Sequence, residues 1–174
     1  MHNGIIENYQ ELKTKLQKTG YTFYSQTDTE IAVKLIDYYY KKTGTPLEAL
    51  TRAMLRIRGS YAFGVMFRDC PGRLFAARKD SPLVVGLGEG ENFIASDVPA
   101  ILPYTRSVVY LNDGDMVVFT KNAAQFYDAN GTPVRKAPEH IEWEMSAAQK
   151  GGYPHFMLKE IYDQPKALRD TINP

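Results

Sequence analysis

Asn3 and Gly4 place an amide side chain beside a flexible backbone N–H near the beginning of the chain. A carboxamide and a neighbouring backbone N–H are the kind of donor pair that stabilises an oxyanion during acyl transfer. Glycine suits the second position because it lets the backbone approach a ligand closely and adopts a positive φ without a Cβ clash. The structural alternative is an Asn-Gly turn, which is common between two elements. The residues alone leave both interpretations open.

Asp28 stands at the expected start of a helix. Thr27 is followed by Glu30 three residues later, which is the capping-box pattern of a helix N-terminus. An acidic side chain in the first turn complements the positive end of the helix dipole. A carboxylate there can serve the helix and still face a pocket. We interpret Glu30 as structural, the reciprocal half of the capping box.

The other reactive side chains give weaker signals. Cys70, the only cysteine, lies in a predicted turn between two strands, and we interpret it as inert. His2, His140 and His155 lack the paired spacing of zinc ligands, so we predict no metal site. The glycine-rich stretch 86–90 lacks the spacing of a nucleotide loop, and we interpret it as a hairpin connection.

The composition excludes several classes of protein. Twenty-one basic and 20 acidic residues give a net charge of +1 without long runs of one sign, which argues against an electrostatic nucleic-acid binder. No apolar run approaches the roughly 18 residues of a membrane span. The 174 residues, 44% of them apolar, are enough for one globular domain with a modest core. A single cysteine fits a reducing cytosol, so we expect a cytoplasmic protein.

The elements that must position these residues are helices followed by strands. Apolar residues at helical spacing predict helices over about 9–19, 28–43 and 46–57. Short apolar runs between turn residues predict strands over 21–24, 61–67, 74–77, 83–86, 93–95, 108–111, 116–120 and 124–127, with a short helix at 98–103. Helices clustered before an antiparallel meander indicate an α+β fold.

We expect two parts along the chain. Residues 132–152 are polar and rich in Pro and Gly, which is typical of a surface excursion or linker. Residues 156–172 have a helical pattern that Pro165 should break. We therefore predict a domain over 1–150 and a helical linker over 151–174.

Several stretches together resemble a known family. They are His2–Asn8, Ser25–Glu30, Arg58–Ala62, Gly90–Asp97 and Tyr153–Pro165. They are similar to the glutaminase domains of class II glutamine amidotransferases, above all to those of the glutamine–fructose-6-phosphate aminotransferases (isomerizing), also called glucosamine-6-phosphate synthases. The resemblance extends over nearly the whole chain, and its last stretch is similar to the segment that leads into the sugar-isomerase domains of that family.

The resemblance implies a fold, a reaction and three site residues. The fold is part of the αββα sandwich of N-terminal-nucleophile hydrolases, with antiparallel sheets. The reaction is hydrolysis of L-glutamine, whose ammonia is used to make glucosamine 6-phosphate from fructose 6-phosphate. Asn3 and Gly4 match the oxyanion hole, and Asp28 matches the carboxylate that binds the α-ammonium group of glutamine. The family implies neither an organic cofactor nor a metal.

The chain departs from the family pattern at its start. Family members begin with a cysteine whose thiol attacks glutamine, whereas this chain begins Met1-His2-Asn3. We therefore expect a fragment of a glutaminase domain that is inactive by itself. The alternative is a non-catalytic binding or assembly module derived from such a domain. Loss of strands from a sandwich would expose sheet edges, which predicts a homo-oligomer that covers them.

Overall fold

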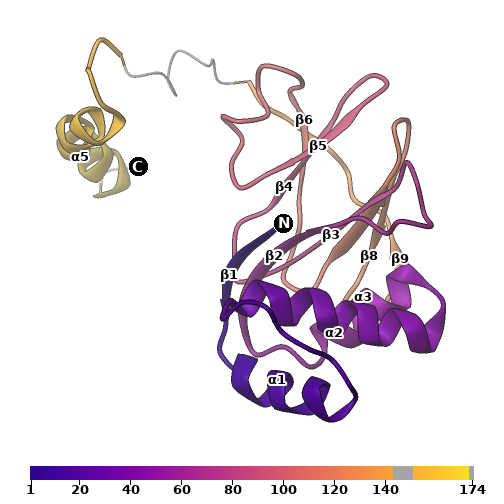
Figure 1. Cartoon of the computed structure of the whole chain (residues 1–174). Helices are drawn as coiled ribbons and strands as arrows, with labels where there is room; N and C mark the ends of the chain where they lie inside the picture. Colours follow the sequence, from indigo (N-terminus) through magenta and orange to yellow (C-terminus); the bar gives the residue numbers. More distant parts are fainter. Residues whose placement is uncertain (143–150, 173–174) are drawn as a thin grey trace. The chain divides into compact units, whose positions relative to one another are not determined.

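A computed structural model of the chain describes residues 1–142 and 151–172 (Figure 1). The chain divides into two compact units, Met1–His140 and Ile141–Pro174. The domain boundary that we predicted after residue 150 borders residues 143–150, which lie outside the described part, and it stays a prediction. None of the described helices is long and apolar enough to cross a membrane.

Three helices of the first unit follow the predicted spacing. They are α1 (Tyr9–Lys18), α2 (Asp28–Thr43) and α3 (Pro46–Met54). The Oγ1 of Thr27 caps α2 by accepting the backbone N–H of Glu30 at 3.4 Å. Gly44 ends this helix in the left-handed conformation, at φ 70°. The predicted limits of α2 are confirmed. They could be predicted because both caps are local sequence signals.

Within residues 1–140, the strands form two antiparallel sheets. One has six strands in the order β1-β2-β3-β7-β8-β9 and the other four in the order β10-β6-β4-β5. The six-stranded sheet contains β1 (His2–Ile6), β2 (Gly59–Val65), β3 (Leu74–Lys79), β7 (Met116–Phe119), β8 (Ala124–Tyr127) and β9 (Pro133–Val134). The four-stranded sheet contains β4 (Val84–Leu87), β5 (Asn92–Ala95), β6 (Ser107–Tyr110) and β10 (Glu139–His140).

Two apolar cores hold the layers of this unit together. One joins the helices to the six-stranded sheet and includes Ile6, Leu35, Leu50 and Phe63. The other lies between the two sheets and includes Ala76, Val85, Val109 and Val117. Figure 1 shows α1, α2 and α3 together on one face of the six-stranded sheet. The helices, the six-stranded sheet and the four-stranded sheet are thus three successive layers. The predicted α+β class is confirmed.

The second unit contains α5 (Phe156–Ile172). Pro165 lies inside this helix, so the predicted break there is wrong. A proline costs the helix one hydrogen bond and crowds the preceding turn, but this part of α5 is exposed, and water can satisfy the freed carbonyl. The ring of Tyr153 stacks on that of Tyr162 with centroids 5.5 Å apart.

Two other local predictions were wrong. Residues 21–24 form no strand: Tyr21 and Phe23 pack on the helical core, and Tyr24 donates its N–H to the carboxylate of Glu30 instead of to a ladder. Residues 98–103 form turns that cover the outer face of β4, where a Cβ on Gly86 would come within 2.4 Å of Ile101. Of the two interpretations left open for the Asn-Gly pair, the turn does not apply, because the pair lies within β1.

Candidate functional site

Gly4 occupies the middle of β1, the edge strand of the six-stranded sheet, with φ 116°. A Cβ at this position would come within 2.3 Å of the carbonyl oxygen of Ser60 and 2.9 Å of the Oγ of Ser81. Only glycine fits both this backbone conformation and this close approach of β1 to β2. The local structure therefore requires glycine whether or not the residue binds a ligand.

The pairing of β1 with β2 determines which backbone groups face outward. Met1 and Gly64 exchange both backbone hydrogen bonds, at 2.9 and 3.0 Å, and the register places Asn3 opposite Ala62. Because hydrogen-bonded pairs alternate with non-bonded pairs along an antiparallel ladder, the N–H groups of His2, Gly4 and Ile6 point away from β2. The N–H of Gly4 is thus directed toward the open edge of the sheet.

Asp28 lies at the same edge. It is the first residue of α2, and its Oδ2 accepts the outward N–H of Ile6 at 2.9 Å. Gly4 and Ile6 are two residues apart, so their outward N–H groups are separated by about 7 Å along the strand. The edge of β1 therefore combines a backbone donor with a carboxylate at a spacing comparable to that between the two ends of an extended glutamine.

The side chain of Asn3 reaches from β1 to the segment that follows β5. Its Nδ2 donates to the Oγ of Ser96 at 3.2 Å, just after β5 in the second sheet. This contact fixes the orientation of the amide and uses one of its donor positions. Asn3, Gly4 and Asp28 are thus brought to one strand and the adjoining helix start. We had predicted no role for Ser96, although it lies in one of the stretches that carry the family resemblance.

His2 joins the same strand to the first turn of α2. Its Nδ1 forms a hydrogen bond of 3.0 Å with the Oγ1 of Thr29, and its ring lies 5.0 Å from that of Phe63. Burial lowers the pKa of His2; nearby Asp28 raises it and the terminal ammonium group lowers it further. Its Nε2 is buried without a hydrogen-bond partner among the described residues. His2 is therefore a neutral side chain that helps to hold β1 against α2.

Glu30 organises the loop that leads to Asp28. Its carboxylate accepts the backbone N–H groups of Tyr24 and Ser25 at 2.9 and 2.7 Å and pairs with Lys34 at 2.6 Å. The hydrogen bond from Lys34, then those from Ser25 and Tyr24, lower the pKa of Glu30 to about 2. The predicted reciprocal bond to Thr27 is wrong, because the Thr27 N–H donates to the Oγ of Ser25.

Cys70 lies at the far end of α2 from this site. Its neighbour Asp69 accepts the hydroxyl of Tyr40 at 2.6 Å, and the hydrogen bond from Tyr40 to Asp69 raises the pKa of that tyrosine to about 12. Tyr40 follows Asp28 by 12 residues, which corresponds to about 18 Å along a helix. The thiol is therefore far from the donors of β1.

A groove of about 540 Å³ runs beside the start of β1. Its lining includes His2 and Thr29 together with the apolar side chains of Val33, Ile36 and Phe63. Asn3, Gly4 and Asp28 are not part of this lining.

Among the described residues, no group of three or more His, Cys, Asp or Glu side chains is arranged to hold a metal ion.

Comparison with known protein families places this geometry in context. Residues 1–103 match the family model of the glutamine amidotransferase domain. Proteins named glutamine–fructose-6-phosphate aminotransferase (isomerizing) are similar over 99% of this chain: the one from Clostridium acetobutylicum is 52% identical, one from Thermus thermophilus 51% and that from Pyrococcus horikoshii 50%. The chain spans only 28 to 29% of the length of these relatives.

A solved structure shares the fold. It is the glutamine phosphoribosylpyrophosphate amidotransferase from B. subtilis, complexed with ADP and GMP. The match has a TM-score of 0.62 and 24% sequence identity, and it covers 78% of this chain and 30% of that one. The predicted N-terminal-nucleophile hydrolase fold agrees with this similarity.

Proposed function

The chain belongs to the glutamine amidotransferase domain family, and from this premise we propose that β1 and the start of α2 form the glutamine-binding part of a glutaminase domain. In this proposal the carboxylate of Asp28 binds the α-ammonium group of L-glutamine. The amide of Asn3 and the backbone N–H of Gly4 stabilise the oxyanion that forms when the side-chain carboxamide is attacked. Neither a metal nor an organic cofactor has a part in it.

The observation that carries the proposal is the 2.9 Å hydrogen bond from Ile6 N–H to Asp28. It places a carboxylate on the edge to which the N–H of Gly4 points, about 7 Å along the strand. A charge-assisted bond to an ammonium group suits this carboxylate, which retains the lone pairs that Ile6 does not use. L-Glutamine carries an ammonium group and a carboxamide at opposite ends, so it can bind the carboxylate of Asp28 with one and the N–H of Gly4 with the other.

The relatives suggest the larger reaction to which this part contributes. We propose that it serves a glutamine–fructose-6-phosphate aminotransferase of the cytoplasm, in which ammonia from glutamine is used to form glucosamine 6-phosphate. The binding of the sugar phosphate is not assigned to this chain. Residues 151–174 would then be the helical linker that leads to the sugar-isomerase domains.

Titration of the chain with L-glutamine tests the proposal. We expect shifts in the amide resonances of Gly4 and Ile6 in NMR spectra, and smaller shifts with D-glutamine at the same concentration. Asp28→Asn should abolish the shift at Gly4 while the spectrum stays that of a folded protein. If L-glutamine shifts neither amide, or if Asp28→Asn binds it equally well, the proposed site is wrong.

We also propose that this chain alone does not hydrolyse glutamine. The attack requires a thiolate beside the oxyanion donors, and the only cysteine, Cys70, lies near Tyr40 at the other end of α2. An assay for glutamate and ammonia should give the rate of the buffer. Turnover that Cys70→Ala removes would contradict this expectation.

A second candidate function is assembly. β1 is an edge strand whose outward N–H groups at His2 and Gly4 have no place in the ladder with β2. Open edges pair readily with other strands, so a homo-oligomer that covers β1 is the corresponding prediction. Light scattering on the purified chain tests it, and a monodisperse monomer at high concentration would argue for the glutamine-binding role alone.

A further inference from the structure

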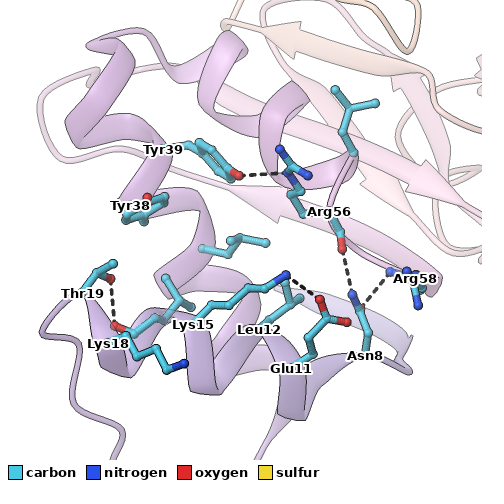
Figure 2. A pocket seen from close by; sticks show the side chains of 13 residues that line it. Asn8, Glu11, Leu12, Lys15, Lys18, Thr19, Tyr38, Tyr39, Arg56 and Arg58 are labelled. Atoms are coloured by element: carbon cyan, nitrogen blue, oxygen red, sulfur yellow. Dashed lines mark hydrogen bonds and ion pairs between the residues drawn. The ribbon is translucent and has the colours of Figure 1, made fainter.

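A second cavity lies on the helical side of the first unit. It has a volume of about 550 Å³ and is enclosed by α1, the second half of α2 and the segment that follows α3. We name it the α1–α2 pocket (Figure 2). Neither Asn3, Gly4 nor Asp28 lines it. Tyr38 and Tyr39, which do, follow Asp28 by 10 and 11 residues, or about 15 Å along α2.

The lining of the α1–α2 pocket concentrates positive charge in a chain of almost zero net charge. Four cationic side chains, Lys15, Lys18, Arg56 and Arg58, face one carboxylate, that of Glu11, which gives the lining a formal charge of 4 − 1 = +3. Lys15 pairs with Glu11 at 2.5 Å. The side chains of Lys18 and Arg58 form no ion pair or hydrogen bond with any described residue. The pocket therefore has cationic groups left over for an anion.

Asn8 fixes the backbone at Arg56 and Arg58, and Tyr39 contacts the side chain of Arg56. The Nδ2 of Asn8 donates to the carbonyl of Arg56 at 2.9 Å, and the N–H of Arg58 donates to the Oδ1 of Asn8 at 2.9 Å. The Nε of Arg56 donates to the hydroxyl of Tyr39 at 3.3 Å. Figure 2 shows these three contacts as dashed lines. The bond to Tyr39 orients the guanidinium of Arg56 without using its two terminal nitrogens, which can bind two oxygens of one anion.

Apart from Asn8 and Thr19, the rest of the lining consists of leucines and tyrosines. Leu12, Leu16 and Leu35 are buried at its base, and the rings of Tyr38 and Tyr39 meet edge to face with centroids 5.2 Å apart. Such a surface favours a flat apolar body over a hydrated ion. A ligand that satisfies the whole lining is thus an amphiphile with a ring at one end and an anionic group at the other.

We propose that the α1–α2 pocket binds a phosphomonoester carried on a ring, with the ring on the leucines and tyrosines and the phosphate at Arg56 and Arg58, the two arginines next to Asn8. A phosphate monoester carries a charge of about −1.5 to −2 near neutral pH, which suits a lining of +3 better than a carboxylate does. A nucleotide and a smaller phosphorylated ring compound share this chemistry. The proposal goes beyond glutamine binding and does not depend on it.

Phenyl phosphate is the probe, titrated into the whole chain and followed by calorimetry and NMR. We expect saturable binding that shifts the amides of Leu16, Tyr39 and Arg58 and leaves Gly4 and Ile6 unmoved. Inorganic phosphate, phenol and benzoate should each bind at least about tenfold more weakly. Inorganic phosphate lacks the ring, phenol lacks the phosphate, and benzoate carries one negative charge in place of nearly two. AMP in place of phenyl phosphate distinguishes a nucleotide site, if it binds more tightly, from a site for smaller rings.

Variants separate this site from general attraction of anions. Arg56→Gln should weaken binding about tenfold or more, whereas Arg73→Gln, which removes the same charge at an exposed position outside the pocket, should leave it unchanged. Tyr39→Phe keeps the ring but loses the hydroxyl that orients Arg56, and it should weaken binding less than Arg56→Gln does. Equal effects of Arg56→Gln and Arg73→Gln, equal binding of inorganic phosphate, or shifts at Gly4 in place of Tyr39 would overturn the proposal.

Discussion

The backbone N–H of Ile6 and the carboxylate of Asp28, 22 residues apart in the chain, form a 2.9 Å hydrogen bond that joins the edge strand β1 to the start of α2. This bond gives Asp28 a structural role besides the proposed binding of glutamine. Its carboxylate accepts an outward backbone N–H that would otherwise lack a hydrogen-bond partner. The two roles can be separated by substitution.

Asp28→Ala should lower the free energy of unfolding by about 1–3 kcal/mol, because it leaves the partly buried N–H of Ile6 without an acceptor. Asp28→Asn keeps an acceptor oxygen and loses the favourable charge at the helix N-terminus, which is worth about 0.3–1 kcal/mol. Urea denaturation of both variants measures the difference. Equal losses would mean that the hydrogen bond contributes nothing beyond the charge.

Gly4→Ala should be strongly destabilising. A side chain at φ 116° is strained, and its Cβ would lie 2.3 Å from the carbonyl oxygen of Ser60. Together these effects predict a loss of about 2–5 kcal/mol. Gly20→Ala is the matched control, because Gly20 has φ 91° but no atom lies within 4 Å of the point that its Cβ would occupy; it should lose about 1–2 kcal/mol. Similar losses at the two positions would show that the close approach of β1 to β2 is unimportant.

His2 should make stability fall in mild acid. Burial lowers its pKa in the folded protein below the ordinary 6.5, so the unfolded chain binds the proton more readily. Stability is then full above about pH 6.5 and declines as the pH falls toward the folded-state pKa. His2→Asn should flatten this decline below about pH 6.5, measured by denaturant unfolding. His140→Asn, at an exposed position, serves as the control and should keep the decline of the unsubstituted protein.

Glu30 should make stability depend on pH in a more acidic range than His2 does, and here the charged form, the carboxylate, is the stabilising one. Its pKa of about 2, against an ordinary 4.5, means that its contribution is present above about pH 4.5 and is lost as the pH falls toward 2. Glu30→Gln should therefore destabilise the protein at pH 7 and reduce its sensitivity to acid in that window. Glu48→Gln breaks an exposed helical pair with Arg52 and should have the smaller effect. Thermal unfolding across this pH range compares the two.

Much of the first unit followed from local sequence signals. Thr27 and Gly44 limit α2 because a hydroxyl cap and a left-handed glycine act within a few residues of the helix they end. The run Ala124–Tyr127 was predicted to the residue because its two aromatic side chains and the turn residues that follow it are local signals as well. The strand predicted over 21–24 was wrong for the complementary reason: its composition favours a strand, but no strand in the part of the chain that the structure describes pairs with it.

The sequence by itself determined the family, the three helices of the first unit and most of its strands, and the residues proposed to bind glutamine, because these depend on residue types and on short spacings. Only the tertiary structure decided that Asn3 and Gly4 lie in an edge strand, since β1 exists through its pairing with β2, more than 50 residues away. It also decided that Asp28 meets Ile6 and that Lys18, Tyr39 and Arg56 share a pocket. Such contacts arise from packing between distant segments, which no local propensity encodes.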